Sequence, residues 1–373
     1  MKTETREKLE AICTEVVAAN ADKVDREGVY PQAAVDALRS AGLLGLISAE
    51  SVGGSGGGHR EAVEVVERIA RDCGSTAMVV CMHYAGAAVV EKFGDETLRK
   101  QVAAGEHLLT LAFSEAGSRS HFWAPVGTAK KDGDTVRLNA RKSWVTSANH
   151  ATAYIWSSQP AEGDGASTIW FVPRNAKGLK PGAGFDGLGL RGNDSTPVAA
   201  EEVAIPLSQR LGAEGAGLQL MLECVLPIFN AMTAACAVGL MEGATAASAG
   251  HLSATRYQHL SSSLAELPTV RAYLARMRIA TDQARCLLMD TVDAIEKGRP
   301  DTMLRVLECK AAAGESATQV TDLAMRVCGG AAFRREVGVE RRFRDARAGT
   351  VMAPTTDQLY DFIGKALCGL PVF

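Results

Sequence analysis

The stretch Gly127-Thr-Ala-Lys-Lys-Asp-Gly-Asp-Thr-Val-Arg-Leu-Asn-Ala-Arg-Lys-Ser-Trp-Val-Thr-Ser-Ala148 decides the fold class of this 373-residue chain. It contains β-branched residues at short intervals, and Asp132-Gly133 between its two halves is typical of a hairpin turn. Similar short runs, each bounded by Gly, Pro or Asp, lie on both sides of it, at residues 107–115, 152–160, 167–174 and 197–205. We therefore predict a middle β domain, a small barrel or sandwich, over residues 109–208.

The residues before and after this β region have the pattern of helices. Near the N-terminus, Leu9, Ile12 and Val16 recur at helical spacing. After residue 209 the chain has few helix breakers, and its alanine-rich stretches favour close helix packing at residues 231–255, 269–297 and 301–328. The order is not the strand–helix alternation of a doubly wound sheet. We predict an α+β protein with an N-terminal helical domain (1–108), the middle domain, and a C-terminal four-helix bundle (209–373).

The composition excludes several classes of function. A net charge of −3 provides no basic surface for nucleic acid, and 5% aromatic residues provide few stacking platforms for single strands. The nearly uncharged run Met78–Val90 is shorter than the about 20 residues of a membrane span, so no span is expected. The N-terminus is charged from Lys2 onward, unlike a signal peptide. We expect a cytoplasmic protein.

Two apparent motifs do not predict a site. The nine cysteines are scattered and form no Cys-x-x-Cys pair, so we expect buried reduced thiols, with neither a disulfide framework nor a metal site. A literal Gly-x-Gly-x-x-Gly pattern occurs at Gly187–Gly192. It is followed by turn-forming residues rather than a helix, and a dinucleotide site needs the N-terminus of a helix at that position.

Two other segments combine groups that suit a planar ligand. Ala112–His121 places hydroxyl groups and a glycine at the end of a predicted strand. Lys142–Ser147 places Trp144 and Thr146 on the same side of a strand by its period of two, with an indole for the face and a hydroxyl for the edge of a heterocycle. An ordinary half-buried strand is the alternative. Likewise, His83 in an apolar helix is either a hydrogen-bonded core histidine or an active-site residue.

Seven segments, in this order and spacing, resemble the acyl-CoA dehydrogenase superfamily over essentially the whole chain: residues 48–56 (SAESVGGSG), 73–83 (CGSTAMVVCMH), 112–120 (AFSEAGSRS), 142–148 (KSWVTSA), 187–196 (GLGLRGNDST), 326–333 (RVCGGAAF) and 341–347 (RRFRDAR). The resemblance implies the same three-domain architecture and FAD as cofactor. It also implies a homotetramer or homodimer with flavin sites shared between subunits.

The resemblance also assigns flavin contacts. Phe113 and Ser114 would face the flavin edge, and Ser120 would approach the pyrophosphate or the thioester end of a substrate. Trp144 and Thr146 would cover the ring and bond near its N5 atom. The remaining matches are Arg256, Gly329 and Gly330, which would act across the dimer, and Thr355.

The catalytic carboxylate of the family is absent from both of its usual places. In most members a Glu removes the α-proton of the acyl thioester, and the matching position here is Ala353. In a minority the base lies at the start of the first bundle helix, near Phe229 here. Other residues that could act as a base or orient a substrate are His83, Tyr84, His121 and Asp357.

Three hypotheses follow from this pattern, and the first is the main prediction because the resemblance over the whole chain supports it. The first is dehydrogenation of an acyl-CoA or another acyl thioester with a displaced base, with an electron-accepting flavoprotein as partner. The second is a flavin-dependent monooxygenase on the same scaffold, which needs no α-proton base, uses FAD or FMN, and takes reduced flavin from a reductase. The third is a pseudoenzyme flavoprotein subunit. Neither nucleic acid nor membrane is expected as a partner.

Overall fold

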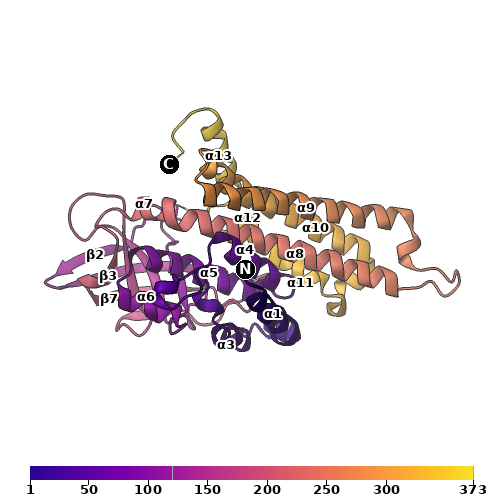
Figure 1. Cartoon of the computed structure of the whole chain (residues 1–373), viewed down its shortest axis with the longest axis horizontal. Helices are drawn as coiled ribbons and strands as arrows, with labels where there is room; N and C mark the ends of the chain where they lie inside the picture. Colours follow the sequence, from indigo (N-terminus) through magenta and orange to yellow (C-terminus); the bar gives the residue numbers. More distant parts are fainter. Residues whose placement is uncertain (120, 373) are drawn as a thin grey trace.

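Two small sheets lie at one end of the molecule beside the N-terminal helices, and long helices form a bundle at the other end (Figure 1). The computed structural model describes residues 1–119 and 121–372. The N-terminal region is helical throughout. Its helices are α1 (Thr3–Ile12), α2 (Ala18–Glu27), α3 (Gln32–Ser40), α4 (His59–Ala70), α5 (Gly74–Phe93) and α6 (Glu96–Ala103), with the π-helical turn Cys13–Val17 joining α1 to α2. Nearly every residue of α5 is buried, because it packs against α4, α6, α8 (Leu226–Ala254) and β1 (Leu109–Ala112).

The middle region contains two four-stranded sheets, which confirms the predicted β-sandwich. The strand orders are β1-β4-β5-β8 and β2-β3-β7-β6, and side chains of both sheets share one apolar core. The hairpin at Asp132-Gly133 joins β2 to β3, with Asp132 opposite Thr135. The strands are β1 (Leu109–Ala112), β2 (Thr128–Asp132), β3 (Thr135–Val145), β4 (Ala153–Ser158), β5 (Thr168–Pro173), β6 (Leu179–Pro181), β7 (Thr196–Pro206) and β8 (Arg210–Leu211).

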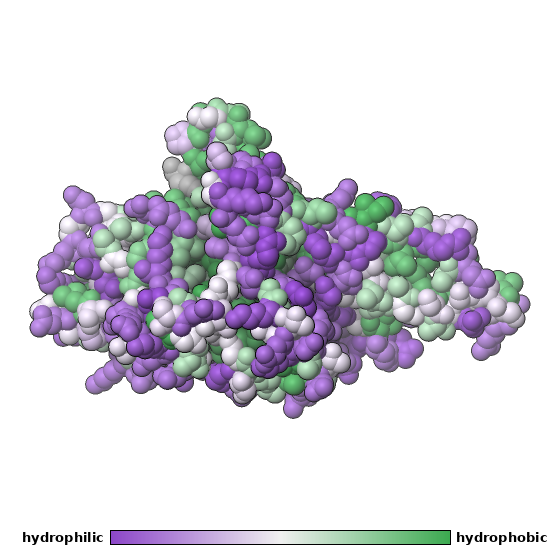
Figure 2. Space-filling model, in the orientation of Figure 1, coloured by the Kyte–Doolittle hydropathy of each residue, from purple (hydrophilic) through white to green (hydrophobic). Residues whose placement is uncertain are grey.

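The last third of the chain is helical, as predicted. The long helices α8, α9 and α10 run side by side, and α13 packs against α10 and projects from the bundle (Figure 1). Apolar side chains gather on this projecting end (Figure 2), where Tyr360, Leu367 and Leu370 are exposed. The helices are α7 (Gly217–Leu220), α8 (Leu226–Ala254), α9 (Pro268–Lys297), α10 (Thr302–Cys328), α11 (Val339–Ala346), α12 (Ala348–Val351) and α13 (Thr356–Leu367).

Helix α8 contains most of an uncharged run, Cys224–Met241, that is longer than Met78–Val90. The expectation that no segment is long enough to span a membrane, which considered Met78–Val90, therefore needs correction. The continuous helix Gly217–Ala254 is long and apolar enough to cross a membrane, yet 83% of its most apolar window is buried inside the protein. Its apolar character therefore fits a core helix of the bundle.

The cysteines follow the prediction only in part. Six are buried and Cys224 is half-buried, but Cys286 and Cys368 are exposed, so the expectation of burial is wrong for these two. All nine are free thiols. The proposed domain limits at residues 108 and 208 stay a prediction.

Candidate active site

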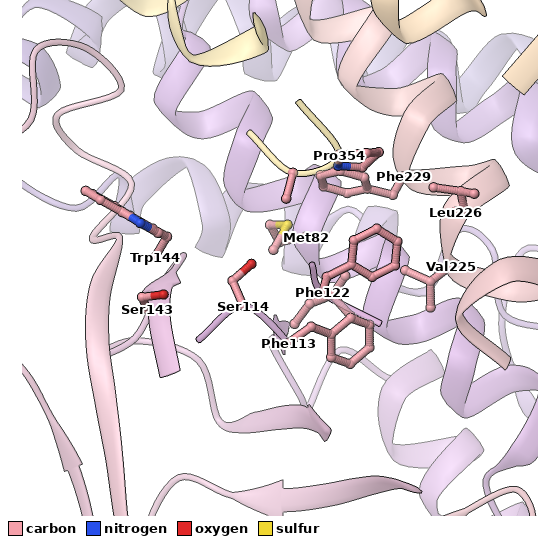
Figure 3. A pocket seen from close by; sticks show the side chains of 12 residues that line it. Met82, Phe113, Ser114, Phe122, Ser143, Trp144, Val225, Leu226, Phe229 and Pro354 are labelled. Atoms are coloured by element: carbon pink, nitrogen blue, oxygen red, sulfur yellow. The ribbon is translucent and has the colours of Figure 1, made fainter. Parts of the chain in front are cut away.

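A pocket lies where the start of α8, the ends of β1 and β3, and the loop before α13 meet (Figure 3). Its volume is about 510 Å³, including the open space at its mouth. Twelve residues line it: Met82, Leu111, Phe113, Ser114, Phe122, Ser143, Trp144, Val225, Leu226, Phe229, Ala353 and Pro354. None of these twelve side chains carries an ionisable group, so the pocket is an apolar hollow with two hydroxyls and an indole on one side.

The side chain of Trp144 projects from the pocket wall because the pairing of β3 is irregular at this point. The pairing of β3 with β7 shifts register between Lys142 and Val145, and Trp144 has a φ of 57°. A bulky residue at positive φ is strained, and such residues cluster at functional sites. The indole is 70% exposed, which leaves one face available for a planar ligand.

Thr146 does not accompany Trp144. The bulge interrupts the two-residue period, so the prediction that both side chains share one side of a strand is wrong. Thr146 is only 4% exposed, and its Oγ1 lies 3.1 Å from the Oγ of Ser195. It therefore joins β3 to the segment before β7, whereas Trp144 lines the pocket.

A buried ion pair that the sequence analysis missed holds the two strand ends together. Lys142 Nζ lies 2.6 Å from Glu115 Oε1, and neither side chain is more than 1% exposed. Lys142 also donates to the carbonyl and hydroxyl oxygens of Ser157, at 2.7 and 2.9 Å. Because Ser114 and Ser143 are adjacent to this pair, it fixes the polar side of the pocket.

His83 and Tyr84 are structural residues, which corrects their place among the catalytic candidates. His83 is fully buried, its Nε2 lies 2.8 Å from the carbonyl oxygen of Leu44, and its Nδ1 accepts from the amide of Leu109. Burial lowers its pKa to about 4, so the imidazole is neutral. The hydroxyl of Tyr84 donates to the carbonyl oxygen of Leu43. Neither side chain reaches the pocket.

The other base candidates also lie outside the pocket lining. His121 is exposed and its ring packs edge-on against Trp123, with 5.0 Å between ring centroids. Asp357 is exposed in the first turn of α13. Thr355 caps that helix, because its Oγ1 accepts from the amide of Gln358 at 3.3 Å. Ser120 lies outside the described residues.

The two positions that the resemblance gives to a catalytic base lie on the same hollow. Ala353 and Phe229 both line it, and Phe229 lies beside Pro354 across from Trp144 (Figure 3). Both are apolar, so the wall opposite the indole has no proton acceptor. Only the tertiary structure brings these positions together, since α8 and the loop before α13 are far apart in sequence.

Arg256, Gly329 and Gly330 lie far from this pocket. Arg256 follows the C-terminal end of α8, whereas Phe229 lies near its start. At about 1.5 Å per residue, the helix separates these ends by roughly 37 Å. The two glycines end α10 beside the same end of α8, where Cys328 contacts Ser248. The predicted cofactor contacts therefore form two groups at opposite ends of the bundle.

The residues around Trp144 fit a flavin ring. They offer one free indole face, the hydroxyls of Ser114 and Ser143, and an apolar floor. Within residues 1–119 and 121–372, no group of three His, Cys, Asp or Glu side chains could hold a metal ion.

Models of known protein families match nearly the whole chain. The model of the acyl-CoA dehydrogenase N-terminal domain matches residues 2–105, that of the middle domain matches residues 110–203, and that of the C-terminal domain matches residues 215–368. These three matches follow the order of helices, sheets and bundle described above.

Individual proteins agree with this result. The chain is 28% identical over 346 residues to the mitochondrial short-chain specific acyl-CoA dehydrogenase of Homo sapiens, covering 90% of this chain and 82% of that one. The butyryl-CoA dehydrogenase of Megasphaera elsdenii has the same fold, with a TM-score of 0.91 at 23% identity over 99% of both chains. So does TdsC of Paenibacillus sp. A11-2, solved with FMN and indole, with a TM-score of 0.89 at 20% identity over 100% and 99% of the two chains.

Proposed function

This chain belongs to the acyl-CoA dehydrogenase family and is a flavin-dependent oxidoreductase of that type, and from this premise we propose that it oxygenates a small apolar substrate. The observation that carries the proposal is the pocket lining, in which none of the twelve side chains can accept a proton at neutral pH. The reaction that fits this pocket is one that needs no basic side chain beside the substrate.

Dehydrogenation of an acyl thioester is harder to reconcile with this lining. That reaction removes an α-proton, and a positioned base supplies about 10²–10⁴-fold of its rate. Ala353 and Phe229 occupy the two places for such a base, and His83, the buried candidate nearest in sequence to the lining residue Met82, has both ring nitrogens bound to backbone groups. Oxygenation of an aromatic ring or a heteroatom has no such requirement.

The residues of the pocket have two roles in this proposal. Trp144, Ser114 and Ser143 hold the flavin ring, by its face and by its polar edge. The wall containing Phe229 and Phe122 binds the substrate and excludes water, which strengthens every polar interaction inside. A bound reduced flavin supplies two electrons to molecular oxygen, so that one oxygen atom enters the substrate and the other leaves as water. We propose FAD, with FMN as the alternative that TdsC supports.

A second candidate is dehydrogenation of an acyl thioester with a base from outside the lining. The observation in its favour is the 28% identity to the human short-chain enzyme over 90% of this chain. Its electron acceptor would be a flavoprotein, whereas an oxygenase would take reduced flavin from a reductase. A pseudoenzyme subunit that depends on a partner is the third candidate.

A second subunit is part of the proposal. Arg256 follows the end of α8 that is about 37 Å along the helix from the lining residue Phe229, and Gly329 lies beside the same end, so they contact a flavin in this pocket only if it belongs to another copy of the chain. We propose a homotetramer or homodimer in the cytoplasm.

The test compares two reactions of the FAD-loaded protein. In one, dithionite-reduced flavin, air and indole are supplied, and oxygenated product is detected by mass spectrometry. In the other, butyryl-CoA is added without oxygen, and loss of the flavin absorbance is followed. Product in the first reaction alone supports the proposal, and flavin reduction in the second alone supports the dehydrogenase. Tight FAD binding without either reaction favours the pseudoenzyme.

A further inference from the structure

Lys310 of α10 is buried without an acidic partner among the described residues. Its side chain is 1% exposed, and its Nζ donates to the carbonyl oxygens of Pro354 at 2.7 Å, Met352 at 3.0 Å and Gly349 at 3.4 Å. Burying an amino group is costly unless it is well hydrogen-bonded, and here burial lowers its pKa to about 7. All three acceptors belong to one short segment, residues 349–354.

That segment forms one wall of the pocket. Ala353 and Pro354 line the hollow, and Met352 and Pro354, on either side of Ala353, supply the two closest acceptors of Lys310. The lysine therefore lies behind the wall and holds it by its main chain. It does not line the pocket itself.

The neighbouring part of this wall, at Phe229, is attached to the same turn of α10. Asn230 is fully buried, and its Nδ2 donates to the carbonyl oxygen of Val306 at 3.1 Å. Val306 precedes Lys310 by one helical turn, and Asn230 is next to the lining residue Phe229. One turn of α10 thus holds both parts of this apolar wall, through two buried polar side chains.

We propose that Lys310 is a positioning residue that holds Ala353 in place beside Phe229, in the wall opposite Trp144, and hence limits the size of substrate that the pocket accepts. The proposal rests on the proposed function only in treating this hollow as the substrate site. Without the amino group, three carbonyl oxygens lose their donor, and the segment 349–354 is free to move away from α10.

Hydrogen exchange of the FAD-saturated full chain, read by mass spectrometry, tests this inference. In Lys310→Met we expect amides of residues 350–353 to exchange about tenfold faster or more, because the segment opens locally. We expect FAD affinity and exchange in β3 to stay unchanged, since the flavin contacts lie on the other side. Lys310→Arg keeps a buried donor and should restore most of the protection.

Thr321→Val is the matched control on the same helix. It removes a buried hydroxyl that donates to the carbonyl oxygen of Ala317 at 2.7 Å, and it should leave residues 350–353 protected. The proposal is overturned if Lys310→Met leaves this segment protected, or if exchange rises equally over all of α10. Should the methionine variant not fold, Lys310→Gln takes its place, and the same two results would overturn the proposal. Exchange needs no turnover, so a failure here differs from failure of the proposed oxygenation.

Discussion

Lys142 and Glu115 form an ion pair of 2.6 Å that is closed off from solvent and ties together the two strand ends of the pocket. Glu115 Oε2 also accepts from the amides of Val126 and Gly127, at 2.7 and 2.9 Å. The pair thus joins the end of β1 to Val126, four residues after the lining residue Phe122. Glu115 follows Ser114 in the sequence, and Lys142 lies two residues before Trp144. The pair therefore supports the side of the pocket at which we propose that the flavin ring binds.

Breaking this pair on one side should destabilise the protein. Removing one member of a buried ion pair leaves an uncompensated charge, which typically costs about 3–5 kcal/mol. We therefore expect Lys142→Met to lower the free energy of unfolding by about this amount, measured by urea denaturation.

The double variant Lys142→Met, Glu115→Gln distinguishes an effect of the ion pair on stability from an effect on flavin binding. Replacing both charges is often nearly neutral, so most of the stability should return. FAD affinity, measured by flavin fluorescence, should stay lower than in the wild type because the charged link between the ends of β1 and β3, beside Ser114 and Ser143, is gone. Wild-type affinity in a stable double variant would show that the pair supports the fold alone.

Trp144→Gly should weaken flavin binding without weakening the fold. The indole is 70% exposed and sits at a φ of 57°, which glycine adopts without strain. Stacked aromatic contacts contribute about 0.5–1.5 kcal/mol, so we expect FAD affinity to fall by about 2–10-fold. The melting temperature should not fall. Trp144→Phe keeps a planar ring and should retain most of the affinity; equal binding by all three proteins would place the flavin elsewhere.

Ala353→Glu tests whether a missing base accounts for the pocket chemistry. A carboxylate there would face the hollow from the wall opposite Trp144, where burial raises its pKa and makes it a stronger base. We expect anaerobic reduction of bound FAD by butyryl-CoA to become at least about 10²-fold faster than in the wild type. Ala353→Gln, similar in size but without basicity, should show no gain. If the Glu variant gains nothing either, the missing-base explanation is wrong.

Lys310 should make stability depend on pH. Burial lowers its pKa to about 7 from 10.5, so between these values the unfolded chain binds a proton that the folded chain does not. Stability should therefore rise with pH through this window, by at most about 1.4 kcal/mol per pH unit. The nearby thiols of Cys81 and Cys309, whose pKa burial raises to about 12, stay neutral throughout.

Urea denaturation between pH 7 and 10 checks this dependence. Lys310→Met should flatten the rise, and the difference between the two proteins isolates Lys310 from other groups that titrate in this window. Lys297→Met, which alters an exposed lysine paired with Asp293, should leave the rise in place. Identical pH profiles for wild type and Lys310→Met would contradict the prediction.

Local signals predicted the elements of the fold correctly. Asp132-Gly133 forms its hairpin because the turn chemistry is contained in a few adjacent residues. The alanine-rich stretches became α8, α9 and α10 for the same reason, since helical periodicity is a property of the segment. The short strands β6 and β8 were missed, because strands of two or three residues form only where a neighbouring strand already offers its edge.

The candidate site was predictable only in part. The motif around Trp144 identified the strand that lines the pocket, and Ala353 and Phe229 were located as the positions without a carboxylate. The bulge that separates Trp144 from Thr146 depends on pairing with β7, which the sequence of β3 alone does not contain. For His83 the structure confirms the core alternative, and it removes Tyr84 from the candidates; the sequence left both open because their backbone partners come from residues 43–44 and β1.

The sequence by itself therefore determined the order of helices and strands, the family, and the absence of a carboxylate at the usual positions. All of these depend on residue type and on spacing along the chain. The tertiary structure alone decided that Glu115 meets Lys142 and that Lys310 holds the wall at Ala353. The first contact joins residues 27 positions apart and the second, from Lys310 to Pro354, joins residues 44 positions apart. Burial, which makes each contact strong, exists only after the domains have packed.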